Sequence, residues 1–70
     1  MNPLTPSSTP DQILETALGK EREAYAFYSG MAAQCKIEDV RRLIESLKDE
    51  EHRHVRLIEA MLARLRSGHG

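Results

Sequence analysis

The chain has 70 residues, a hydrophobic content of 40% and a formal net charge of −1 at pH 7. The balance of 10 basic and 11 acidic side chains gives no electrostatic reason to expect binding to nucleic acid or to an anionic membrane surface. A domain of this size buries only about 60% of its unfolded surface, and one cysteine cannot form an internal disulfide. We therefore expect oligomerisation or a core metal to supply stability.

The first eight residues are rich in proline, serine and threonine. Such a segment cannot bury enough apolar surface to offset the entropy of ordering, so we predict a flexible tail over residues 1–8. It lacks the basic and apolar regions of a secretory signal, and no apolar run of the chain is long enough to span a bilayer. With a single cysteine, these features favour a cytoplasmic protein that does not enter the membrane.

The first predicted helix covers residues 10–34. Thr9 and Gln12 have the spacing of a capping box, and Pro10 falls in the first turn, where its missing N–H is not needed. Apolar side chains then recur at steps of three and four, which indicates one amphipathic helix. The members of this stripe are Leu14, Ala17, Ala24, Tyr28, Met31 and Cys35, and Ile13, Leu18, Tyr25 and Ala32 widen it.

A second helix is predicted for residues 38–66, ending before Gly68. Its apolar stripe consists of Val40, Leu43 or Ile44, Leu47, Ile58, Met61 and Leu65. The few residues between the helices allow only an antiparallel hairpin, so residues 9–67 are expected to form one all-α domain. A hairpin with a full apolar face on each helix is half a core. We expect two copies to pair about a two-fold axis into a four-helix bundle.

Three ionisable side chains interrupt the apolar stripes: Glu21 in the first helix, and Glu51 and His54 in the second. A buried carboxylate without a partner costs several kcal/mol or instead takes up a proton, so a core-facing glutamate needs a partner such as a cation or metal. From a turn centred near residues 36 and 37, Glu21 lies about 15 residues back, Glu51 about 14 forward and His54 about 17 forward. At about 1.5 Å per residue, all three fall within roughly one helical turn of height.

A two-fold axis would double this set to four carboxylates and two imidazoles. Oxygen and imidazole ligands suit iron or manganese, and this is the ligand set of di-iron and di-manganese carboxylate bundles. We therefore predict two iron ions per dimer site, with manganese or zinc as substitutes. The pair Asp49 and His52 has similar spacing but lies off the apolar stripe, so we expect His52 to be solvated.

Two segments resemble those of a known family. Residues 21–28, EREAYAFY, resemble the Glu-x-x-Ala-x-x-x-Tyr segment of rubrerythrins and encapsulated ferritins. Residues 47–54, LKDEEHRH, resemble their Leu-x-x-x-Glu-x-x-His segment. The resemblance implies that the expected bundle of two hairpins is ferritin-like. It further implies that Glu21, Glu51 and His54 are metal ligands and that Tyr28 hydrogen-bonds to a ligand carboxylate. It also implies ferroxidase or peroxide-reducing chemistry, an oxidoreductase function. The chain has no counterpart of the four-cysteine, rubredoxin-like module of rubrerythrins.

Two alternatives remain open from the sequence. Glu51 and His54 could instead form a polar pair that fixes helix register. The chain would then be a metal-free or zinc-stabilised dimerisation module without catalysis. In the other alternative, the chain serves as cargo or in storage within a larger ring of hairpins, with metal sites at some subunit interfaces.

Overall fold

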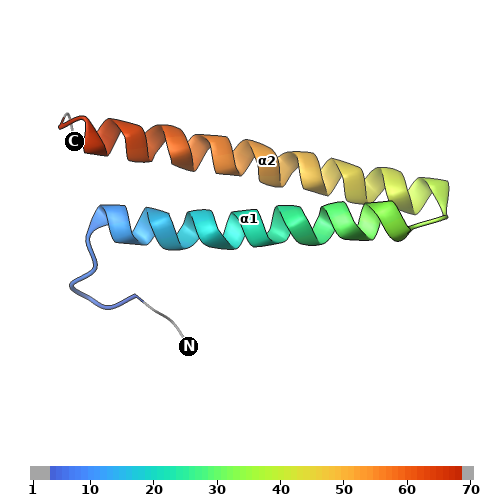
Figure 1. The fold of residues 1–70 in the computed structure, drawn as a ribbon, viewed down its shortest axis with the longest axis horizontal. Coiled ribbons are helices and arrows are strands. Elements are labelled where there is room, and N and C mark those ends of the chain that lie inside the picture. The colour runs from blue at the N-terminus through green and yellow to red at the C-terminus, as the bar shows by residue number, and fades with distance from the viewer. Residues whose placement is uncertain (1–3, 69–70) are drawn as a thin grey trace.

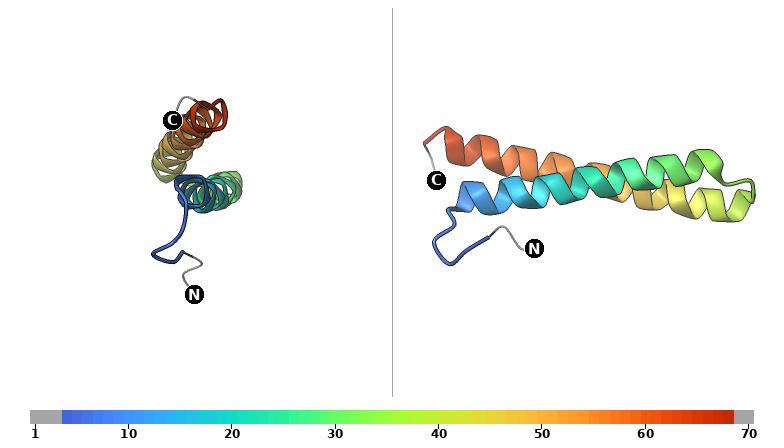
Figure 2. Two further views of the ribbon diagram at one scale, coloured as in Figure 1. Left: turned by 90° about the vertical axis from the view of Figure 1, so that its left-hand side faces the viewer. Right: turned by 60° about the horizontal axis from the view of Figure 1, so that its bottom comes forward.

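The structure, a computed structural model, describes residues 4–68 as two antiparallel helices joined by a short turn (Figure 1). Helix α1 spans Pro10–Gln34 and helix α2 spans Glu38–Arg66. Residues 4–68 contain no strand, so the predicted all-α hairpin is confirmed. The helices lie alongside each other and cross at a shallow angle (Figure 2). Within the same residues, neither helix is long and apolar enough to cross a membrane.

Helix α1 begins with the capping box that the sequence predicts. The N–H of Gln12 donates to Oγ1 of Thr9 at 3.2 Å, and the N–H of Thr9 donates to Oε1 of Gln12 at 2.9 Å. Pro10 occupies the first turn, and Asp11 places a negative charge at the positive end of the helix dipole. Two otherwise unpaired backbone N–H groups are thereby satisfied.

The ends of α2 differ in how they are capped. Ile37 precedes the helix without a side-chain cap, and the acidic residues Glu38 and Asp39 in the first turn act on the helix dipole instead. The helix ends with the N–H of Ser67 donating to the carbonyl of Ala63 at 3.0 Å. Gly68 follows with a φ of 85°, the left-handed conformation that favours glycine after a helix.

Part of the predicted amino-terminal tail has local structure. A turn closes between Thr5 and Ser8, where the N–H of Ser8 donates to the carbonyl of Thr5 at 3.0 Å. The N–H of Thr5 in turn donates to Oγ of Ser8 at 2.9 Å. Residues 1–3 lie outside the described residues, and the flexibility of residues 1–8 stays a prediction.

The core of a single hairpin is thin. Among the described residues, four hydrophobic side chains are buried: Leu18, Ala32, Ile44 and Leu62. The radius of gyration is 15.2 Å, against about 11 Å for a compact domain of this length. The accessible surface is 5473 Å², against about 4,400 Å² for a compact monomer of this mass. The hairpin thus leaves much of its surface uncovered.

The apolar stripe of each helix is wider than its contact with the other helix. Since each residue turns an α-helix by about 100°, the exposed part of both stripes falls on the same side of the hairpin. We call this the apolar side; its large exposed members are Ile13 and Met31 from α1 and Val40, Leu43, Leu47 and Met61 from α2. Leu43 is 60% exposed and Val40 is 46% exposed. In α1 only one edge of the expected stripe is buried, at Leu18 and Ala32. In α2, Ile44 of the expected stripe is buried together with Leu62, which lies outside that stripe.

Ion pairs occupy the opposite side of the hairpin. Arg22 of α1 lies 2.8 Å from Glu59 of α2, and Arg66 of α2 contacts Glu15 and lies 3.5 Å from Asp11. The hydrogen bond to Glu15 is the main cause that raises the pKa of Arg66 above its ordinary value. Exposed pairs of this kind contribute little to stability, because water and salt screen them. This side is thus suited to water, whereas the apolar side is not.

Candidate metal centre

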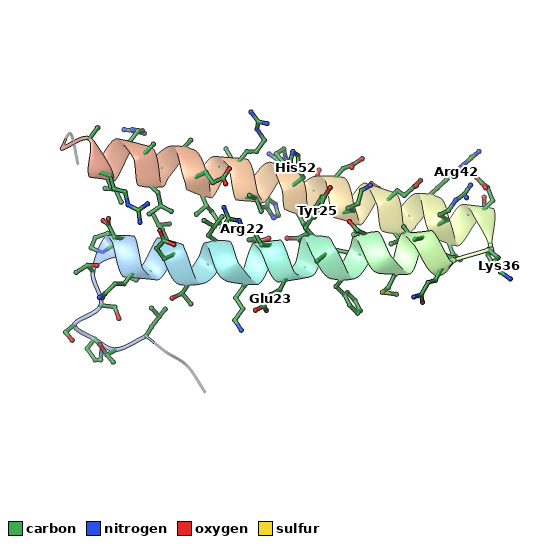
Figure 3. All side chains as sticks on the ribbon, in the orientation of Figure 1. Arg22, Glu23, Tyr25, Lys36, Arg42 and His52 are labelled. Atoms are coloured by element: carbon green, nitrogen blue, oxygen red, sulfur yellow. The ribbon has the colours of Figure 1, made fainter. Side chains whose placement is uncertain are left out.

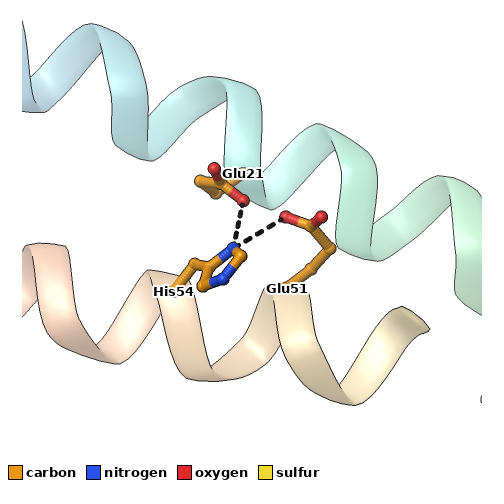
Figure 4. A group of neighbouring side chains, drawn as sticks. All are labelled: Glu21, Glu51 and His54. Carbon is orange, nitrogen blue, oxygen red and sulfur yellow. Dashed lines mark hydrogen bonds and ion pairs between the residues drawn. The ribbon is translucent and has the colours of Figure 1, made fainter. Parts of the chain in front are cut away.

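Three ionisable side chains meet between the helices near the middle of the hairpin (Figure 4). Glu21 comes from α1, and Glu51 and His54 come from successive turns of α2. Each offers one ligand atom, and these atoms all lie within 4.8 Å of one another. The structure thus brings together the three residues that the sequence predicts to meet.

The imidazole of His54 stands between the two carboxylates. Its Nδ1 lies 3.3 Å from Oε2 of Glu21, within hydrogen-bond distance, and 3.6 Å from Oε2 of Glu51. Spacing i, i+3 on α2 puts Glu51 and His54 on one helical face. The antiparallel pairing of the helices then brings Glu21 to the same height. Three oxygen and nitrogen donors consequently converge on one small volume.

The surroundings of Glu51 test whether a metal fits the cluster of Glu21, Glu51 and His54. Its Oε2 is buried and has no hydrogen-bond partner among the described residues. Leaving a buried charged acceptor unsatisfied costs more than the 1–3 kcal/mol typical of a neutral group. Both oxygen and imidazole donors suit a hard or borderline divalent cation. A cation in contact with Glu51 would remove this cost, so the residues present fit a metal.

The three side chains are partly shielded in the single hairpin. Exposed fractions are 20% for Glu51, 30% for Glu21 and 40% for His54. The remaining exposure is not on the ion-paired side, because the helical positions of Glu21 and His54 turn toward the apolar side. Whatever covers the apolar side would therefore also close the cluster from water.

The other nitrogen of His54 also faces a carboxylate. Nε2 of His54 lies 4.0 Å from Oε2 of Glu50, one turn earlier on α2. The same Oε2 accepts a hydrogen bond from Nη2 of Arg53 at 3.0 Å. Sequence reasoning did not single out Glu50, although its i, i+4 spacing to His54 was a signal that could have found it.

The two tyrosines near the cluster lie in different surroundings. Tyr28 is half-buried, and its ring packs against Phe27 with the centroids 5.7 Å apart. Within residues 4–68, no hydrogen bond joins its hydroxyl to Glu21 or Glu51, so its predicted role stays a prediction. Tyr25 reaches across to α2, where its ring lies beside the ring of His52 (Figure 3). The centroids of the two rings are 5.7 Å apart. His52 itself is exposed.

Comparison with known families agrees with this geometry. Residues 12–70 match the family model of rubrerythrin, which is nearly the whole hairpin. The chain belongs to the rubrerythrin family. This is a family of ferritin-like di-iron carboxylate proteins, whose members typically bind iron. No curated protein and no solved structure matches the chain.

Because the chain belongs to the rubrerythrin family, its donors can be compared with the ligand set of di-iron carboxylate bundles. A di-iron carboxylate bundle uses one Glu from each of two helices and a Glu-x-x-His pair from each of the other two. One hairpin of this rubrerythrin-family chain supplies Glu21 and the pair Glu51 and His54. That is half of the ligand set of such a bundle, supplied by two helices where the bundle has four.

Proposed function

We propose that this rubrerythrin-family protein holds a pair of iron ions between two hairpins and uses them for ferroxidase or peroxide-reducing chemistry. Glu21, Glu51 and His54 of each copy would be the ligands, and manganese or zinc could occupy the same donors. The single observation that carries the proposal is the converging cluster with the unsatisfied, buried Oε2 of Glu51. Family membership supports the choice of iron.

A second copy of the chain is the occupant that we propose for the apolar side. Val40, Leu43, Leu47 and Met61 project from α2, and Ile13 and Met31 add to them from α1. An uncovered apolar strip along both helices is what a two-fold partner with the same strip would bury. The ion pairs on the opposite side have no such need for cover. Pairing through the apolar side would form the predicted four-helix bundle.

Charge balance supports the same arrangement. Glu21 and Glu51 from two copies would bring four carboxylates into one core. Two divalent ions carry four positive charges, so the ions and the carboxylates would neutralise each other while both imidazoles stay neutral. A single hairpin with one ion would leave donors missing and the site open to water. The dimer is therefore part of the proposed function and not an addition to it.

The bound metal pair would supply one-electron redox chemistry toward O2 or peroxide. The chain would contribute the rest. Glu21 and Glu51 provide fixed negative charge, His54 provides a neutral nitrogen donor, and the paired apolar sides exclude water. Ferroxidase activity is the simplest version, because Fe(II) is then the substrate and no organic substrate pocket is required. A cytoplasmic, reducing location would keep iron in that form, and we include it in the proposal.

The test is metal content and iron oxidation of the intact chain. Loaded protein should contain about two tightly bound irons per dimer and should oxidise Fe(II) in the presence of O2. Glu51→Ala should lose both properties. Glu45→Ala is the matched control, because Glu45 is an exposed glutamate of the same helix away from the cluster. Unchanged binding and oxidation in Glu51→Ala would contradict the site.

A second function is favoured by the apolar side alone. The exposed apolar strip would drive pairing even without a metal, which corresponds to a metal-free or zinc-stabilised dimerisation module. A strong chelator distinguishes the metal centre from a metal-free module, and zinc in place of iron in the purified protein would identify a zinc-stabilised module. If iron is structural to the site, chelation should lower the melting temperature; for a metal-free module, melting temperature and molar mass should not change. Molar mass would also separate a dimer from a larger ring of hairpins.

A further inference from the structure

His54 has a carboxylate facing each of its two ring nitrogens. On one side, Nδ1 faces Glu21 at 3.3 Å and Glu51 at 3.6 Å. On the other side, Nε2 faces Oε2 of Glu50 at 4.0 Å. A neutral imidazole carries one N–H and one lone pair, and the partner of the N–H decides which nitrogen is free to ligate. Glu50 therefore lies where it can stabilise the tautomer of His54 that carries its proton on Nε2.

We propose that Glu50 is a positioning residue of the metal centre. With metal bound, Nδ1 no longer donates to Glu21; Glu50 then accepts the Nε2–H of His54 and so keeps the lone pair of Nδ1 directed at the metal between Glu21 and Glu51. This inference rests on the proposed metal-binding function and adds Glu50 to the residues of that metal centre. The general basis is that histidines which bind metals donate their second ring N–H to a carboxylate or carbonyl, which fixes ring orientation and raises ligand basicity.

The observed 4.0 Å is longer than a hydrogen bond, but the surroundings of Glu50 allow the distance to shorten. The Glu50 side chain is 56% exposed and has room to rotate. Its spacing i, i+4 to His54 lies within ordinary side-chain reach on a helix. Exposed Arg53 donates to the same Oε2 at 3.0 Å, and this oxygen has a second lone pair for His54. A movement of about 1 Å brings the contact into the hydrogen-bond range.

The location of Glu50 around α2 separates it from an ordinary surface glutamate. By helical rotation it falls near Leu43, Leu47 and Met61, at the edge of the apolar side. Glu45 of the same helix turns to the ion-paired side instead. Pairing of two hairpins through the apolar side would remove water from around Glu50. A hydrogen bond to His54 would then be stronger than at an open surface.

The test measures zinc affinity of the full chain by competition with a chromophoric chelator. Zinc is chosen because it fits the donors and is diamagnetic. Glu50→Ala should bind zinc about 10- to 100-fold more weakly than the parent chain. Glu50→Gln should recover part of this loss, since its amide oxygen still accepts. Arg53→Gln and Glu45→Ala are controls, and their zinc affinity should stay within about two-fold of that of the parent chain. The reason is that exposed ion pairs contribute little free energy.

A second readout follows the imidazole itself. In zinc-loaded protein labelled with ¹⁵N-histidine, the shifts of His54 should show Nδ1 bound to metal and Nε2 protonated. Unchanged affinity in Glu50→Ala, coordination through Nε2, or an equal loss in Arg53→Gln would each overturn the role of Glu50. If the parent chain itself binds no metal, the proposed function fails as well. Helix content by circular dichroism checks that every variant is folded.

Discussion

His54 Nδ1 and Glu21 Oε2 lie 3.3 Å apart and join α1 to α2 through the only part-buried side-chain hydrogen bond between the helices in residues 4–68. The other two, Arg22 to Glu59 and Arg66 to Glu15, are exposed. A polar contact at the centre of a thin apolar core contributes less to stability than a well-packed hydrophobic pair would. The two residues therefore suit a ligand site better than they suit packing.

Glu51 lies beside this contact, and Glu51→Leu should have opposite effects on the stability of the metal-free and the iron-loaded protein. Without metal, the substitution removes a buried, unsatisfied carboxylate oxygen and should stabilise the dimer by about 1 kcal/mol or more. With iron, the parent should be the more stable of the two, since a ligand at 100 times its Kd adds about 2.7 kcal/mol. Thermal melts with and without chelator measure both effects.

Glu45→Leu is the control for the gain in stability, because Glu45 is exposed and away from the cluster. It should change neither the metal-free melt nor the metal response. A Glu51→Leu protein that is less stable than the parent without metal would mean that Glu51 is a structural partner of His54. The reading of the cluster as a register pair would then be favoured.

The hairpin and its capping box could be predicted from sequence because their causes are local. The period of three and four residues, the short turn and the pair Thr9 and Gln12 act within a few residues of each other. Height along a hairpin also follows from residue count, which is why Glu21 could be matched to Glu51 and His54.

Other features depend on how the helices are rotated about their axes, which periodicity does not give. Val40 and Leu47 share one apolar stripe with Ile44, yet Ile44 is buried and the other two are exposed. The period defines an apolar arc but not the part of it that touches the other helix. Glu50 was missed for the same reason. Its value as a partner depends on the direction of the His54 ring, which only the structure shows.

Leu47→Lys should disrupt pairing through the apolar side. A charge at this exposed apolar position would have to be buried in the dimer, at a cost of several kcal/mol. We expect the molar mass to fall to that of the 7.9 kDa chain, with loss of metal binding. Asp49→Lys places the same side chain two residues on, about 200° around α2, and should leave the mass unchanged. A parent chain that is already monomeric by light scattering would contradict the proposed dimer.

Thr9→Ala should destabilise the protein by about 1 kcal/mol, because it removes the oxygen that accepts from the N–H of Gln12. The melting temperature of a chain this short should then fall by about 4–8 °C. Thr9→Ser keeps the accepting hydroxyl and should melt close to the parent. Metal content should be unaffected in both variants, since Thr9 is more than three helical turns from Glu21 along α1.

Tyr28→Phe tests the role that the family resemblance gives to this hydroxyl. Tyr28 follows Glu21 by two turns of α1 and turns toward the apolar side, so pairing of two hairpins would bring its hydroxyl into the closed core. If it then hydrogen-bonds to a ligand carboxylate, its loss should lower metal affinity or the rate of Fe(II) oxidation by about tenfold. Tyr25→Phe is the matched control, because the Tyr25 ring contacts exposed His52 instead. Equal activity of both variants, at unchanged molar mass, would show that Tyr28 serves packing against Phe27 and not the metal centre.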